Sequence, residues 1–261
     1  KFWKKPLLGR MGYLLSDFVA KKKDGSEDAI LKAIKMEDNL FNLSNRIIVT
    51  TDSMADSIKA RSHRFAEKTI IIPNYVDTDC FMPDDSATKD FDLIFIGRLS
   101  HQKNIKVLLE AVKYLNIKVL IIGDGELRKG LQSQYGDLNG SITWKSNIPN
   151  HDLPSYLNRS RIFILPSLYE GHPKALIEAM SCGLAAIGAN SPGISELIIH
   201  NYNGWLCDIS SESISNEIQF LLNNSDLCSK LGENARKYVI ENFALDHIIN
   251  LEMNAYESIL Y

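Results

Sequence analysis

Two glutamates eight positions apart, Glu170 and Glu178, are the residues whose types and spacing best suit chemistry. Glu170 follows an apolar run that ends at Leu165, and Glu178 lies inside the helix predicted after Pro173. Proline is favoured at a helix start, and the unpaired N–H groups there favour an anion. Carboxylates on both sides of such a start suit a ligand that is anionic in its middle and hydroxylated at both ends. A nucleotide diphosphate sugar has this layout.

The backbone between the two glutamates is also expected to contact a ligand. Gly171 allows the main chain to approach a ligand closely, and the N–H groups from Gly171 to Leu176 are expected to point toward it. The spacing therefore predicts a binding site in one short strand–loop–helix segment.

A second candidate anion-binding loop runs from Gly97 to Asn104, between a predicted strand and a predicted helix. Arg98 and Lys103 can converge there beside a helix N-terminus, which itself favours anions. The planar fork of arginine and the point charge of lysine together suit a diphosphate. Taken alone, the pair is explained more simply as two solvated surface cations.

Two further motifs are interpreted as structural. The segment Gly123–Glu126 lacks the third glycine of a dinucleotide-binding loop, so a tight turn with Asp124 capping the next helix explains it. Asp90 and Asp92 form a D-x-D pattern of the kind that holds a divalent metal, yet they open a predicted strand. Because two cations are available for a diphosphate, this pattern is interpreted as coincidental, and neither a metal nor a cofactor is predicted.

Short apolar strands alternate with amphipathic helices from about residue 91 onward, which predicts a parallel sheet covered on both faces. In such doubly wound sheets, ligands bind outside the carboxyl ends of the strands, where these loops lie. The predicted strands are 92–96, 118–122, 142–144, 162–165 and 185–187. The predicted helices are 104–115, 126–135, 175–182 and 195–199, with a last one at 243–261.

The net charge of −3 at pH 7 gives no reason to expect a nucleic acid partner. Apolar and basic residues are interleaved over residues 1–25, a mix that can lie on an anionic membrane surface. The alternative is one or two ordinary solvated helices with an apolar underside. Scattered cysteines and the lack of a long apolar run predict a cytoplasmic location, at the inner face of the membrane if residues 1–25 bind it.

The pattern E-G-x-P-x-x-x-x-E-A-M-x-C-G, from Glu170 to Gly183, resembles the E-x7-E signature of family 4 glycosyltransferases. The similarity covers roughly residues 40–240, in the right order. Its other parts are Gly97-Arg98-Leu99 with Lys103-Asn104, Ile122–Gly125, Leu165-Pro-Ser167, Gly193-Ile-Ser-Glu196, and Ile72-Pro-Asn74 with Val76, Asp77 and Phe81.

The resemblance implies an α/β fold of the GT-B type. Residues 76–240 would be its complete C-terminal domain, a Rossmann-like, doubly wound parallel sheet that binds the nucleotide-sugar donor. Residues 1–75 would be a remnant of the N-terminal, acceptor-side Rossmann-like domain with the linker. Residues 241–261 would be a helix that crosses back to that domain.

By position, the resemblance implies that Arg98 and Lys103 hold the donor diphosphate and stabilise the leaving group, while Glu170 contacts the donor sugar. These three residues would be the catalytic group. Glu178 would bind the ribose hydroxyls, and the base would lie against the main chain near Ile148. The other implied donor-binding residues are Gly97, Gly171, His172, Pro173, Lys174, Ala175 and Leu176.

Two of these positions depart from the family's usual pattern. His172 stands where an aromatic or aliphatic residue is more common, and Lys174 stands where an apolar residue is common. Both could touch the donor, and His172 could equally be a packing residue.

The implied activity is retaining, metal-independent transfer of a sugar from a UDP- or GDP-sugar to a glycan or lipid-linked acceptor in cell-envelope polysaccharide or glycoconjugate synthesis. Because the first residue is Lys1 and not Met, the chain is expected to lack its natural beginning, and hence to be incomplete for catalysis. Two alternatives stay open: a non-catalytic nucleotide-sugar-binding module, and a sugar-nucleotide epimerase of the same fold.

Overall fold

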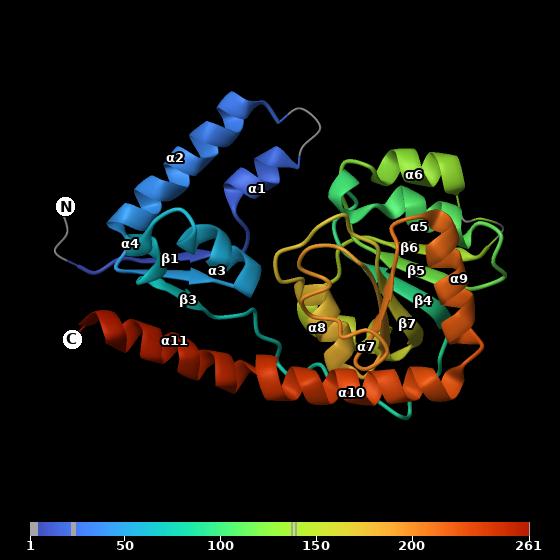
Figure 1. Cartoon of the computed structure of the whole chain (residues 1–261). Coiled ribbons are helices and arrows are strands. Elements are labelled where there is room, and N and C mark those ends of the chain that lie inside the picture. The colour runs from blue at the N-terminus through green and yellow to red at the C-terminus, as the bar shows by residue number, and fades with distance from the viewer. Residues whose placement is uncertain (1–4, 22–24, 137, 139, 261) are drawn as a thin grey trace. The chain divides into compact units, whose positions relative to one another are not determined.

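The computed structural model describes residues 5–21, 25–136, 138 and 140–260. The chain divides into two compact units, each built on its own parallel sheet (Figure 1). The larger unit runs from Val76 to Ala244, and the smaller comprises residues 1–75 and 245–261. Residues 1–4 and 22–24, part of the segment predicted to contact a membrane, lie outside the described residues.

The sheet of the larger unit has six parallel strands in the order β6-β5-β4-β7-β8-β9. The chain moves outward from β4 to β5 and β6, then returns to the other side of β4 for β7. The strand order therefore reverses between β4 and β7. The strands are β4 (Phe91–Ile96), β5 (Val119–Ile122), β6 (Ile142–Lys145), β7 (Ser160–Leu165), β8 (Ala185–Ala189) and β9 (Trp205–Cys207).

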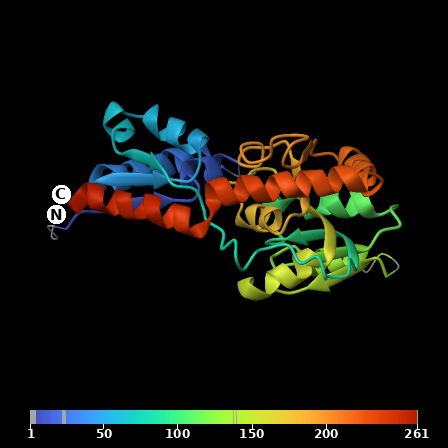
Figure 2. The same cartoon turned by 90° about the horizontal axis from the view of Figure 1, so that it is seen from below.

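Helices cover both faces of this sheet. Helix α5 packs against α9, and α8 packs against both α7 and α10 (Figure 2). The helices are η1 (His101–Lys103), α5 (Ile105–Val112), α6 (Arg128–Tyr135), η2 (Asn150–Asp152), α7 (Leu153–Asn158), α8 (Lys174–Ser181), α9 (Ser211–Leu222) and α10 (Ser225–Phe243).

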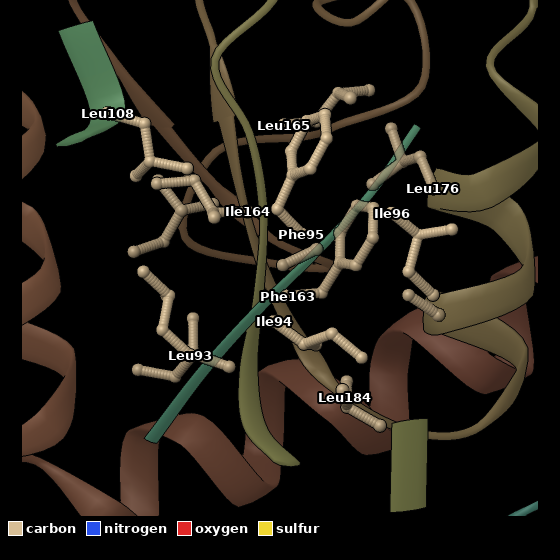
Figure 3. Close-up of a cluster of buried hydrophobic side chains, with 14 of the residues drawn as sticks. Leu93, Ile94, Phe95, Ile96, Leu108, Phe163, Ile164, Leu165, Leu176 and Leu184 are labelled. Carbon is tan, nitrogen blue, oxygen red and sulfur yellow. The ribbon is translucent and has the colours of Figure 1, made fainter. Parts of the chain in front are cut away.

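The two central strands are apolar along almost their whole length because both of their faces are buried. Leu93 of β4 lies on the same side as Leu108 of α5, whereas Ile94 lies on the other side with Phe163 and Leu176 (Figure 3). Burying one such side chain stabilises the fold by about 1.5–3 kcal/mol. This core holds the carboxyl ends of β4 and β7 side by side.

The smaller unit has three parallel strands in the order β1-β2-β3. Ile47 and Val49 of the central strand pack with Phe41 in one cluster, while Ile48 packs with Ile248 in a second. The elements are β1 (Leu8–Met11), α1 (Leu15–Ala20), α2 (Glu27–Leu43), β2 (Arg46–Val49), α3 (Asp52–Lys59), α4 (His63–Ala66), β3 (Thr69–Ile71) and α11 (Leu245–Leu260).

Residues 8–11 form a strand whose backbone pairs in parallel register with the buried strand β2. One helix predicted from the sequence, at residues 195–199, is wrong. Residues 195–199 form a series of turns, because the buried Asn203 side chain takes the hydrogen bonds that a helix would need there. Its Oδ1 accepts from the Ile199 N–H at 2.7 Å, and its Nδ2 donates to the Leu197 carbonyl at 3.1 Å. Within the described ranges, the helices are too short or too polar to cross a membrane.

Candidate functional site

The predicted site residues lie in loops at the carboxyl ends of neighbouring strands. Gly97 and Arg98 follow β4, and Glu170 follows β7, on the two sides of the point where the strand order reverses. Open α/β sheets bind ligands in the crevice at such a point. The topology thus places the two candidate loops at the expected binding edge.

The loop after β5 packs main chain to main chain against the loop after β4. The Leu99 N–H donates to the Asp124 carbonyl at 2.8 Å, and a Cβ on Gly123 would lie 1.9 Å from the Gly97 oxygen. Asp124 does not cap α6 as predicted, because that helix begins only at Arg128 and the Asp124 carboxylate accepts from the Gly125 N–H. The segment is therefore a spacer that fixes the neighbouring loop.

Lys103 and Glu170 form an ion pair that joins the loops after β4 and β7. The Lys103 Nζ donates to the Glu170 Oε1 at 2.6 Å, and the two side chains are only 18% and 8% exposed. Gln102 strengthens this connection, since its carbonyl accepts from the Leu168 N–H and its side-chain amide donates to the Tyr169 carbonyl. A cation and a carboxylate are thus held together where the strand order reverses.

Arg98 does not converge with Lys103 as the sequence predicted. Its side chain is 74% exposed and lies 3.5 Å from Glu126, while Lys103 is paired with Glu170. An ion pair this exposed contributes little stability, so Arg98 can turn toward a ligand at small cost.

A cavity of about 520 Å³ lies over the carboxyl ends of β4, β5 and β6. Gly97 and Arg98 form one part of its wall, and Asn147 and Ile148 form another. Ile148, implied as the contact for a base, therefore faces the same cavity as the start of the β4 loop.

Helix α8 begins at Lys174, with Pro173 as its N-cap residue. The Leu176 N–H donates to the Pro173 carbonyl at 3.1 Å and is therefore not available to a ligand. The predicted set of ligand-facing amides, Gly171 to Leu176, thus ends before Leu176. The main chain before the helix is tightly constrained. The Glu170 N–H donates to the Pro192 carbonyl at 2.9 Å, and a Cβ on Gly193 would lie 2.3 Å from the Glu170 oxygen.

Glu178 is 3% exposed, and its Oε1 accepts a hydrogen bond from the Asn150 Nδ2 at 2.9 Å. Burial raises the pKa of the Glu178 carboxyl, while the Asn150 hydrogen bond and the charge of Lys174 act in the opposite direction. Sequence reasoning missed Asn150, because a polar residue in a loop after a strand carries no signal of the side chain it will meet.

His172 is buried in this structure and packs against an aromatic ring. It is 6% exposed, and its ring lies edge-on to Phe243 with centroids 4.8 Å apart. Burial lowers the pKa of His172 to about 4, so the imidazole is neutral at pH 7.

The depressed pKa of His172 predicts a loss of stability in mild acid. In the unfolded chain the imidazole has its ordinary pKa of 6.5, and in the folded chain its pKa is about 4, so protonation favours unfolding as the pH falls between these values. From pH 7 to pH 4.5 this group should lower the free energy of unfolding by about 2 kcal/mol. Urea unfolding of the wild type and of His172→Phe at both pH values measures it. Equal pH dependence in the two proteins would contradict the prediction.

Asp90 and Asp92 lie at the amino end of β4, on the edge of the sheet opposite the candidate site. Asp90 pairs with Arg159 at 2.6 Å, and Asp92 pairs with Arg161 at 3.2 Å. Among the residues that the structure describes, His, Cys, Asp and Glu side chains form no cluster of three that could hold a metal ion.

The family model for glycosyl transferases group 1 matches residues 81–238. An Escherichia coli protein named UDP-Gal:alpha-D-GlcNAc-diphosphoundecaprenol alpha-1,3-galactosyltransferase is 32% identical over 202 residues, covering 67% of this chain and 50% of that protein. A Campylobacter jejuni alpha-1,4-N-acetyl-D-galactosaminyltransferase, named for a substrate on PP-undecaprenol, is 27% identical, covering 75% of this chain and 56% of that protein. The chain thus spans about half the length of these relatives.

Solved structures share the fold at low sequence identity. Sucrose-phosphate synthase from Thermosynechococcus elongatus matches with a TM-score of 0.84 and 21% identity, covering 97% of this chain and 67% of that one. HepE from Anabaena, solved in complex with UDP, matches with a TM-score of 0.82 and 19% identity, covering 98% and 73%. These likenesses confirm the predicted α/β fold of the GT-B type.

Proposed function

This chain belongs to the group 1 glycosyl transferases, and from that premise we propose that its larger unit binds the nucleotide diphosphate of a UDP- or GDP-sugar. The sugar is transferred to a glycan or lipid-linked acceptor in the synthesis of a cell-envelope polysaccharide or glycoconjugate. The observation that carries this proposal is the Lys103–Glu170 pair, which sits between two candidate binding loops where the strand order reverses. The names of the two bacterial relatives, with a UDP-sugar donor or undecaprenol-linked substrates, support it.

In the proposed reaction, the cations stabilise the departing diphosphate. Negative charge develops on that group as the bond to the sugar breaks, and fixed positive charge is most effective there. Lys103 is held at the junction of the loops, and Arg98, five positions earlier in the same loop, lies on the cavity wall. Glu170 then contacts sugar hydroxyls, and Glu178 contacts the ribose.

We propose the finer features of the mechanism on the resemblance to family 4. The configuration of the sugar is retained, and the two cations take the role that a divalent metal has in other transferases. Contact of residues 1–25 with an anionic membrane stays a prediction. The assignment of the smaller unit to the acceptor-side domain also stays a prediction.

The alternatives are distinguished by their products. A transferase forms a new glycosidic bond and releases the nucleoside diphosphate, whereas an epimerase changes the configuration of the sugar. A binding module leaves the nucleotide sugar unchanged. Mass spectrometry and NMR of reactions with UDP- and GDP-sugars would separate the three.

Nucleotide binding by this chain tests the proposed site directly. Arg98→Ala should weaken the affinity for UDP or GDP by about tenfold or more, since hydrogen bonds to charged groups contribute about 1.5–3 kcal/mol. Arg159→Ala is the matched control, because it removes an arginine at the opposite edge of the sheet. Isothermal titration calorimetry with EDTA present is the measurement. Equal losses in the two variants, or binding that EDTA abolishes, would contradict the proposal.

A further inference from the structure

The side-chain amide of Asn150 fixes one oxygen of the Glu178 carboxylate. Its Nδ2 donates to the Glu178 Oε1 at 2.9 Å, between residues 28 positions apart in the chain. Within the described part of the chain, this is the one hydrogen bond to the Glu178 side chain. The second oxygen therefore keeps its lone pairs for a ligand.

Asn150 belongs to a short turn whose flanking residues line the cavity. It opens η2, directly after Pro149, and the Asp152 N–H donates to the Pro149 carbonyl at 3.0 Å. Ile148, just before this turn, and the buried Leu153, just after it, both line the cavity over β4, β5 and β6. One segment thus connects the cavity wall to the Glu178 carboxylate.

We propose that Asn150 is a positioning residue that gives the site its preference for ribose over 2′-deoxyribose. This inference rests on the proposed function, since it takes Glu178 as the ribose contact. A carboxylate distinguishes the 2′,3′-diol of ribose from the single hydroxyl of 2′-deoxyribose only while its acceptor oxygen is directed at both hydroxyls. In Glu178 that acceptor is the oxygen that Asn150 does not bind. The terminal torsion of glutamate is broad, so without a partner the carboxylate rotates. Asn150 removes this freedom by binding Oε1.

The ionisation of the Glu178 carboxyl also supports this role of Asn150. Glu178 is almost fully buried in the helix, and burial favours its protonated form. The hydrogen bond from Asn150 stabilises the ionised form, in which the other oxygen is purely an acceptor for hydroxyls. Loss of Asn150 therefore disturbs both the direction and the charge of the acceptor.

The test is the ratio of affinities for a ribonucleotide and its 2′-deoxy counterpart. Calorimetry at pH 7.5 compares UDP with 2′-deoxy-UDP and GDP with 2′-deoxy-GDP. The ratio is taken for the base, uracil or guanine, whose nucleotides bind more tightly. The wild type should prefer the ribonucleotide by about tenfold or more, the effect of one hydrogen bond to a charged group. Asn150→Ala should bring the ratio to about two while the affinity for the 2′-deoxy nucleotide changes less than twofold.

Three further variants make the result decisive. Asn150→Asp keeps the shape of the side chain but replaces the donor with an acceptor, so it should lower the ratio as well. His151→Ala, on the same turn, should keep the ratio of the wild type. Glu178→Gln should lower it.

A wild-type ratio in Asn150→Ala and Asn150→Asp, together with a lowered ratio in Glu178→Gln, would overturn the role of Asn150 and leave the proposed function intact. A wild-type ratio near one, or an unchanged ratio in Glu178→Gln, would overturn the ribose assignment itself. An equal loss of affinity for both nucleotides in Asn150→Ala would show a merely structural role.

Discussion

Gly193→Ala should lower the free energy of unfolding of the larger unit by about 3 kcal/mol and abolish nucleotide binding at micromolar ligand. Gly193 has a φ of +81°, where an L side chain costs about 1–2 kcal/mol. Its added Cβ would lie 2.3 Å from the Glu170 carbonyl oxygen and 2.5 Å from that of Gly171. Both atoms are main chain, so the Glu170 loop must move, and overpacking of this kind costs a further 1–3 kcal/mol, roughly.

Gly130→Ala is the matched control for this prediction. Gly130 lies inside α6, and a Cβ there would have no atom within 4 Å. The substitution should stabilise the unit by about 0.5–1 kcal/mol, because alanine loses less backbone entropy than glycine in a helix. Urea unfolding followed by circular dichroism, with calorimetry for UDP and GDP, gives both quantities. A similar free energy of unfolding in the two variants would contradict the prediction, because it would show that the Glu170 loop moves away from the added Cβ without loss of stability.

Lys103→Met should destabilise the larger unit by about 2–4 kcal/mol, even though methionine fills much of the same space. The Glu170 carboxylate is 8% exposed, and without Lys103 its negative charge would be buried and unpaired. Removing one partner of a buried ion pair is costly for this reason, whereas replacing both partners often is not.

The double variant Lys103→Met/Glu170→Gln separates these effects. It should be more stable than Lys103→Met alone, since no charge is then left buried, and the double-mutant cycle gives the coupling between the two residues. Calorimetric or urea unfolding of the four proteins provides the data. Additive effects of the two substitutions would mean that the pair contributes nothing as a pair.

The sequence was sufficient to predict the fold class because strands buried on both faces leave a continuous apolar run. Helix α8 illustrates the success: residues 175–182 were predicted and 174–181 are observed. The error at residues 195–199 has the opposite cause. There the local pattern is helical, but the side chain of Asn203 binds the backbone in its place.

The candidate site was less predictable, because its geometry depends on which side chains meet across the sheet. The positions of Glu170, Lys103 and Ile148 in loops followed from the strand pattern. The pairing of Lys103 with Glu170 and not with Arg98 did not, since both cations lie in the same loop. Asn150 had no signal at all. The roles implied by the family resemblance stay predictions for the experiments above.

The reversal of strand order between β4 and β7 also bears on how the unit folds. Lys103 and Glu170 are 67 positions apart, and their loops meet only after β7 has paired with β4. Closing so long a loop costs chain entropy and slows folding relative to local pairing. The candidate site therefore forms late in folding and is absent from any intermediate that contains only β4, β5 and β6. Nucleotides added during refolding should stabilise the final state without accelerating its first steps.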